Sequence, residues 1–162
     1  MNFNQILQIW LKGELLQGKV MIIVGVLLLL AAIAIFRNQN ELLRGTLLPI
    51  GFLITVLIGY GGYILQSRPA HVAQSEALYH SSPIQAVARE IDKHTSDNQI
   101  GNTLLKIYPV LAIIAIVVLM WLPSGSYRGI ALGFTFVFLS ALIIDNGFVT
   151  RSNAVIQAIS KL

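Results

Sequence analysis

The chain has 162 residues, of which 56% are hydrophobic and only 11% are charged, and its formal net charge is +4. Soluble domains carry about a quarter charged residues, so this composition and a mean hydropathy of +0.75 are typical of a membrane protein. The absence of cysteine excludes disulfides and thiolate metal centres. In a chain this apolar, the modest positive charge indicates contact with anionic lipid and not with nucleic acid.

Residues 1–19 predict an amphipathic helix that lies in the membrane interface. Phe3, Leu7 and Trp10 recur at helical spacing, with polar residues such as Gln8 and Lys12 between them. Tryptophan is enriched at the level of the lipid headgroups, so Trp10 is the expected interface anchor. The alternative for this segment is a surface on which a partner protein docks.

Four apolar runs are long enough to cross a bilayer, which takes roughly 20 residues as a helix. They cover residues 20–36, 46–65, 104–122 and 130–149. Backbone groups in lipid must bond within their own segment, so these runs are helices. The sequence therefore predicts an all-α protein in which residues 1–162 form a single membrane domain with four transmembrane helices.

Basic residues favour one orientation in the membrane. The side that holds both termini and the long connection, residues 66–103, carries eight of them: Lys12, Lys19, Arg68, Arg89, Lys93, Lys106, Arg151 and Lys161. The other side carries three: Arg37, Arg44 and Arg128. The excess of positive charge predicts that the termini and the long loop are cytoplasmic.

The two halves of the chain share a pattern that indicates an internal duplication. An Arg-Gly pair opens both the second span, at 44–45, and the fourth, at 128–129, and a shift of 84 residues superposes Phe52 on Phe136. Each half then forms one helical hairpin, and the hairpins are related by a pseudo-two-fold axis along the membrane normal. The alternative is that two apolar helices align loosely by chance.

Small residues mark the faces on which membrane helices pack closely. Gly51, Thr55 and Gly59 form a stripe at four-residue spacing on the second span, and Gly129 and Gly133 form a GxxxG pair at the start of the fourth. We expect these faces to pack within one chain, and the alternative is a homo-oligomer or a membrane-protein partner.

Asp145 is a lone carboxylate inside the fourth span, and such a group usually faces a partner in the protein interior. Lys106 lies as far before the centre of the last turn as Asp145 lies after it, so an antiparallel hairpin places the two at one depth. We therefore expect an ion pair that sets the register of the hairpin. The functional alternative is a proton or cation site at Asp145.

The long loop is expected to be helical. Ser82 suits an N-cap and Pro83 the first helical position, while Ile84, Val87 and Ile91 predict one apolar face. The stretch "TSDNQIGN" predicts a stop before the third span.

Glu90 and His94 in this loop are four residues apart and are the candidate metal ligands. A zinc site needs at least one more converging ligand, so we expect surface histidines, no metal and no cofactor.

The sequence contains no HExxH, GxSxG or P-loop motif. It therefore indicates a non-enzymatic membrane protein that acts as an accessory or binding subunit through helix packing and loop contacts. One concrete version is an immunity-type protein that pairs with a membrane-targeting toxin. The alternatives are an oligomeric ion or proton channel or transporter that uses Asp145, and a small lipid-acting enzyme with a polar pocket at one membrane face.

The opening "WLKGELLQGK" and the ending "IIDNGFVTRSNAVIQAI" resemble a group of small four-span bacterial inner-membrane proteins. In that group a tryptophan-lysine-glycine-glutamate stretch, here residues 10–14, precedes the first span. An aspartate, here Asp145, closes the last span ahead of an arginine, here Arg151. The resemblance implies a bacterial inner membrane and the four-span layout, and it brings no activity with it.

Overall fold

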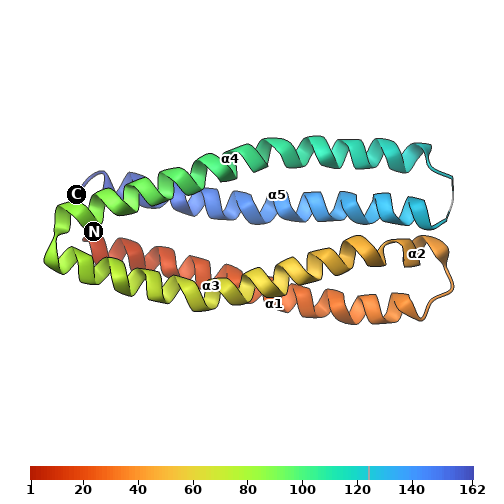
Figure 1. The fold of residues 1–162 in the computed structure, drawn as a ribbon, viewed down its shortest axis with the longest axis horizontal. Helices are drawn as coiled ribbons and strands as arrows, with labels where there is room; N and C mark the ends of the chain where they lie inside the picture. Colours follow the sequence, from red (N-terminus) through yellow and green to blue (C-terminus); the bar gives the residue numbers. More distant parts are fainter. Residues whose placement is uncertain (124) are drawn as a thin grey trace.

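The computed structural model describes residues 1–123 and 125–162. Over these residues the chain forms five helices, and no strand occurs in them. Their bounds are α1 Phe3–Phe36, α2 Glu41–Gly45, α3 Leu47–Ser81, α4 Pro83–Trp121 and α5 Ser126–Ile159 (Figure 1). All but the short α2 are long and apolar enough to cross a membrane, which confirms the prediction of an all-helical chain with four such helices. The last predicted short connection, residues 123–128, includes residue 124, which lies outside the described residues.

The long helices form two antiparallel hairpins that lie side by side (Figure 1). α1 packs mainly against α3, and α4 packs mainly against α5. Both termini and the link between α3 and α4 lie at one end, which we call the termini end. The links from α1 to α3 and from α4 to α5 lie at the other end, the loop end. Both hairpins thus turn at the same end, whereas the duplication itself stays a prediction.

The helices are much longer than the predicted spans. They contain 34 to 39 residues, or roughly 50 to 60 Å at about 1.5 Å per residue, against a hydrocarbon core of about 30 Å. α1 runs without a break through residues 19 and 20, so residues 1–19 do not form a separate helix lying in the interface. Residues 66–103 are the ends of α3 and α4 and not a loop with its own short helices.

Tertiary packing explains why the predicted stop before the third span is absent. Asn98, in the turn-prone stretch, is buried, and its Nδ2 donates to Asn153 Oδ1 of α5 at 2.8 Å. His94 is also buried and lies against Ser152 of α5. Side chains that would cap or close a turn in a free segment bond instead to the neighbouring helix, so α4 continues through them.

The start of α4 at Pro83 agrees with the sequence, although the Ser82 side chain makes no capping bond. Its buried face differs from the predicted one, because Ile84 is 85% exposed. The face turned inward is largely polar and consists of Ala86, Glu90, His94 and Asn98 at four-residue spacing.

The surface of the bundle changes character along its length. At the termini end an apolar core is enclosed, made of Phe3, Ile6, Leu7, Trp10, Leu11, Val72, Ala86, Val155 and Ile159. Toward the loop end large apolar side chains face outward, as in Ile23, Leu30 and Ile113. Apolar groups that face outward over several helices are stable in lipid and costly in water, which supports a membrane location for that half.

Of the two predicted small-residue faces, the one on α5 packs closely within the chain and the one on α3 does not. A Cβ at Gly129 would collide with the Leu42 carbonyl oxygen, and one at Gly133 would collide with the Pro49 ring. These two glycines therefore pack α5 closely against α2 and α3 within the chain. A Cβ at Gly51 or Gly59 would meet nothing within 4 Å, so these two glycines do not serve close packing within the bundle.

Candidate functional site: a polar pocket at the membrane boundary

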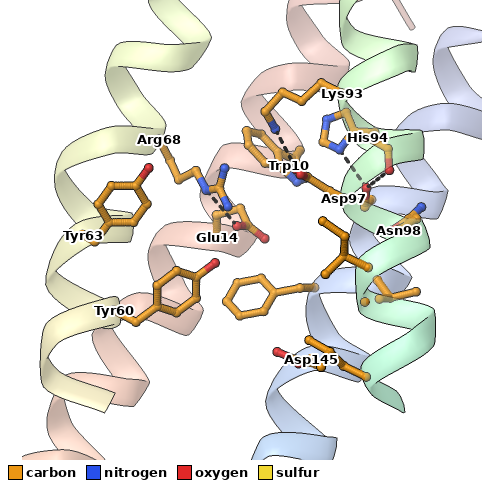
Figure 2. A pocket seen from close by; sticks show the side chains of 16 residues that line it. Trp10, Glu14, Tyr60, Tyr63, Arg68, Lys93, His94, Asp97, Asn98 and Asp145 are labelled. Carbon is orange, nitrogen blue, oxygen red and sulfur yellow. Dashed lines mark hydrogen bonds and ion pairs between the residues drawn. The ribbon is translucent and has the colours of Figure 1, made fainter. Parts of the chain in front are cut away.

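A pocket of about 440 Å³ with many polar residues is lined by all four long helices. α1 contributes Trp10 and Glu14, and α3 contributes Tyr60, Tyr63 and Arg68. α4 and α5 complete it with residues from Lys93 to Leu104 and from Asp145 to Ser152 (Figure 2).

The pocket lies where the apolar spans meet the polar ends of the helices. Tyr63 is near the end of the predicted second span, Leu104 begins the third and Asp145 is near the end of the fourth. On its rims, Tyr63 of α3 is 58% exposed and Ile100 of α4 is 62% exposed. The mouth therefore opens between α3 and α4 at the level of the membrane boundary.

Glu14 is the centre of the first buried charge cluster, with 1% of its surface exposed. Arg68 Nε lies 3.3 Å from its Oε2, and Arg151 Nε donates to its Oε1 at 3.0 Å. Arg151 Nη2 also donates to Gln17 Oε1. Two guanidinium groups from different helices thus compensate one carboxylate, which would be costly if it were buried alone.

Glu90 forms the second cluster and is fully buried. His71 Nε2 lies 3.0 Å from its Oε1, Ser75 Oγ donates to the same oxygen at 2.6 Å, and His94 Nε2 lies 3.5 Å from its Oε2. Burial favours the neutral carboxyl, but His71, His94 and Ser75 together outweigh it and hold the pKa of Glu90 well below its ordinary value.

His94 joins this cluster to α5. Its Nδ1 lies 2.8 Å from Ser152 Oγ, and both residues line the pocket. Its Nε2 is buried and makes no hydrogen bond, since the contact with Glu90 lacks the geometry of one. Glu90, His94 and Ser152 therefore form a row across the bundle.

Trp10 lies inside the protein and not among lipid headgroups, with only 5% of its surface exposed. The ring of His94 meets the indole edge-on at a centroid distance of 5.1 Å. Lys93 Nζ and Arg68 Cζ lie 5.1 and 5.4 Å from the indole centroid. The prediction of an interface anchor is wrong because α1 continues straight into the bundle, where the other helices cover this ring.

Asp145 is held by Tyr108 and not by Lys106. Tyr108 Oη donates to Asp145 Oδ2 at 2.9 Å, and among the residues described no ion pair joins Asp145 to Lys106, which is exposed. The predicted depth was reasonable, since an antiparallel hairpin brings residues near 106 beside residue 145. The face was wrong, because residues 106 and 108 point about 200° apart around a helix.

Glu90 and His94, the candidate metal ligands, do meet, and His71 joins them on the other side of the carboxylate. Over residues 1–123 and 125–162, however, no group of three or more His, Cys, Asp or Glu side chains could hold a metal ion. Glu90 hydrogen-bonds to His71 and Ser75, and its second oxygen lies 3.5 Å from His94 Nε2.

Sequence reasoning missed Glu14 as the buried centre of the pocket wall, although a signal was present. Phe3, Leu7, Trp10 and Glu14 follow one stripe at spacings of three and four residues, so Glu14 occupies a core position. Arg68, Arg151 and Ser152 come from distant segments, and no local pattern connects them with Glu14 or His94.

A second cavity of about 390 Å³ lies between α4 and α5 toward the loop end. Its walls are almost entirely apolar, with residues such as Ile114, Val118, Phe134 and Phe138. It therefore offers space for hydrocarbon but no polar chemistry.

No family model, curated protein or solved structure matches the chain. The functional conclusion therefore rests on the chemistry of the polar pocket.

Proposed function

We propose that this protein is a non-enzymatic membrane binding subunit that holds the polar head of an amphiphilic molecule in the pocket between α3 and α4. The observation that carries the proposal is a pocket with charged walls whose mouth, between Tyr63 and Ile100, opens at the membrane boundary. A lipid or lipid-like molecule can enter such a mouth sideways from the bilayer.

The distribution of polarity in the pocket matches an amphiphile. Arg68, Lys93 and Asn98 lie toward the termini end, where a headgroup would sit. Outside the mouth, α3 and α4 expose apolar side chains such as Phe52 and Ile107, along which hydrocarbon chains would lie. Binding sites for small molecules commonly combine a few placed polar groups with apolar walls.

The alternative of an ion or proton channel has less support. Two threonine hydroxyls inside the spans bond to their own helices, since Thr55 Oγ1 donates to the Gly51 carbonyl and Thr135 Oγ1 to the Ala131 carbonyl. The second cavity is apolar.

The alternative of a lipid-acting enzyme also has less support, although the row of Glu90, His94 and Ser152 contains a hydroxyl, an imidazole and a carboxylate. Acyl transfer needs donors aimed at the developing oxyanion. Ser152 lies inside α5, where backbone N–H groups bond within the helix. Ser152 Oγ also lies 3.3 Å from the His94 carbonyl oxygen. This arrangement favours a structural link between α4 and α5.

A role as an accessory subunit would use the open stripe of α3. Thr55 and Gly59 are exposed, and an added Cβ at Gly51 or Gly59 would meet nothing within 4 Å. Small residues let a second helix approach closely, so a partner helix, a second copy or a toxin segment would pack there.

The binding proposal is tested with the full-length protein in a mild detergent. Native mass spectrometry during titration with a mixture of zwitterionic and anionic phospholipids should show one lipid that binds saturably per chain. Ile100→Trp places an indole in the mouth and should weaken this binding at least fivefold. Ile113→Trp is the matched control, because Ile113 is an equally exposed isoleucine of α4 that does not line the pocket and lies on a different face of the helix.

Binding that never saturates, or equal loss in both variants, would show that the pocket is not the site. Both variants must retain the helical circular dichroism of the wild type, so that misfolding is not mistaken for occlusion of the mouth.

A further inference from the structure

One carboxylate of the polar pocket has no cation beside it. The pocket is lined by two cations and three carboxylates: Arg68, Lys93, Glu14, Asp97 and Asp145. Arg68 pairs with Glu14, and Lys93 pairs with Asp97. No ion pair of Asp145 occurs within residues 1–123 and 125–162. The lining therefore has one formal negative charge in excess, and this charge is that of Asp145.

The excess remains when the charged groups behind the lining are counted. Arg151 adds a second guanidinium to Glu14, and the buried Glu90 adds a fourth carboxylate. Three Lys and Arg side chains then face four carboxylates. The neighbouring histidines, His71 and His94, both lie against Glu90. The charge without a partner is therefore still the one on Asp145.

Asp145 presents one oxygen atom to the pocket. Tyr108 Oη donates to Oδ2 at 2.9 Å, but a neutral hydroxyl leaves the charge of the carboxylate uncompensated. Oδ1 accepts no hydrogen bond from the residues that the structure describes. In Figure 2 Asp145 lies between α3 and α4, and its carboxylate points toward the side of Tyr60. A group that enters through the mouth between these helices can therefore reach Oδ1.

Aromatic rings adjoin this carboxylate. Phe148 follows Asp145 by three residues and so lies on the same side of α5. The Tyr60 ring meets Phe148 edge-on at a centroid distance of 5.7 Å, and Tyr63 stacks on Tyr60 at 6.0 Å. Arg151 Cζ already lies 5.2 Å from the Phe148 centroid, whereas both tyrosines are partly exposed. Because the face of a tyrosine ring attracts cations, this wall adds to the attraction of the carboxylate.

We infer that Asp145 binds a primary ammonium group of the ligand, and that the ligand is an aminophospholipid of the phosphatidylethanolamine kind taken from the adjacent leaflet. The inference rests on the proposed function and names the chemistry of its ligand. A carboxylate near lipid is costly without an opposite charge. A primary ammonium supplies this charge and three N–H donors, of which one can donate to Oδ1. A quaternary ammonium has no N–H to donate.

The surroundings of the mouth favour a lipid over a free amine as the source of the ammonium group. The rim residues Tyr63 and Ile100 are more than half exposed. Phe52 on α3 and Val110 on α4 continue the apolar surface away from the pocket. A free amine such as ethanolamine would contact none of this surface, whereas two acyl chains would cover it.

The test compares phosphatidylethanolamine with phosphatidylcholine of identical chains, each titrated into the full-length protein in detergent and followed by native mass spectrometry. Both lipids are zwitterionic, so they differ in the N–H donors and not in net charge. We expect a preference of about tenfold for phosphatidylethanolamine, the size of one charge-assisted hydrogen bond.

Two variants locate this preference in the pocket. Asp145→Asn should abolish most of it, and the isosteric amide can still accept the hydrogen bond of Tyr108, so the hairpin stays intact. Asp97→Asn is the matched control and should retain the preference, because it removes a carboxylate of the same pocket that is already paired with Lys93. Both variants must keep the thermal melting temperature of the wild type.

Each other outcome has a defined meaning, and the first two need no variant. Saturable binding of both lipids with equal affinity would overturn the ammonium inference and leave the proposed function standing, whereas no saturable binding of either would overturn both. An equal loss in Asp97→Asn would assign the preference to overall charge and overturn the site at Asp145. Displacement of bound lipid by millimolar ethanolamine would overturn the membrane as the source of the ligand.

Discussion

Individual residues in this protein combine into clusters that local sequence does not reveal. Glu14, Arg68 and Arg151 are far apart in the chain, yet both arginines contact one buried carboxylate. Lys106 and Asp145 were paired in the prediction because they lie at the same depth in the hairpin. They form no ion pair, because the rotation of α4 about its axis turns Tyr108 toward Asp145. Depth follows from counting residues, whereas the direction of a side chain depends on how each helix is rotated in the bundle.

At the residue scale, stability should depend on the ionisation of Glu90. Its pKa is lower in the folded protein than in the unfolded chain, so its stabilising contribution is present above about pH 4.5 and is lost as the pH falls through the folded value. Glu90→Gln should lower the free energy of unfolding at neutral pH by roughly 1–3 kcal/mol and should flatten the acid dependence.

Thermal melting in detergent from pH 7 to pH 3 measures this effect. Asp92→Asn is the control, because Asp92 is exposed two residues away on the same helix. The same acid dependence in wild type and Glu90→Gln would assign the effect to other carboxylates.

At the scale of elements, the ends of the helices do not coincide with the points where the sequence changes from apolar to polar. α4 begins at Pro83, as the sequence indicates, yet it continues through the polar stretch that predicted a stop. The polar stripe from Glu90 to Asn98 bonds to neighbouring helices. Periodicity of apolar residues overlooks such a face, because the buried positions are polar.

The two glycine faces give an element-scale prediction. Gly129→Leu should lower the free energy of unfolding by roughly 1–3 kcal/mol or more, since even a Cβ there collides with the backbone of α2. Gly51→Leu should cost less than about 1 kcal/mol, the order of a change in helix propensity, because the space around it is open. Thermal melting of the two variants under identical conditions makes the comparison. Equal losses would mean that Gly51 is covered by a second copy.

At the scale of the whole molecule, four continuous helices connect a half suited to lipid with a half suited to water. The polar pocket lies where these halves meet, so the site is a product of the whole bundle and not of one segment. The chain has no cysteine, so single cysteines can report the environment of each level.

Ile84→Cys at the termini end and Trp121→Cys at the loop end should react with a membrane-impermeant maleimide, because both positions are more than 80% exposed. Ile113→Cys should not react in membranes, although Ile113 is 60% exposed in the bundle, because lipid covers it. In intact cells Trp121→Cys should react first, and Ile84→Cys only after permeabilisation, if the termini are cytoplasmic. Rapid reaction of Ile113→Cys would contradict the membrane location.

The number of spans, their order and the helical class follow from local properties of the chain, because twenty apolar residues must form a helix in lipid whatever surrounds them. The polar pocket, the burial of Trp10 and Glu14 and the partner of Asp145 required the folded bundle. They depend on the rotation of four helices about their axes and on contacts between segments more than fifty residues apart, as between His94 and Ser152. The packing of complementary helix faces determines both the rotations and these contacts, and the hydropathy of the sequence does not indicate which faces pack together.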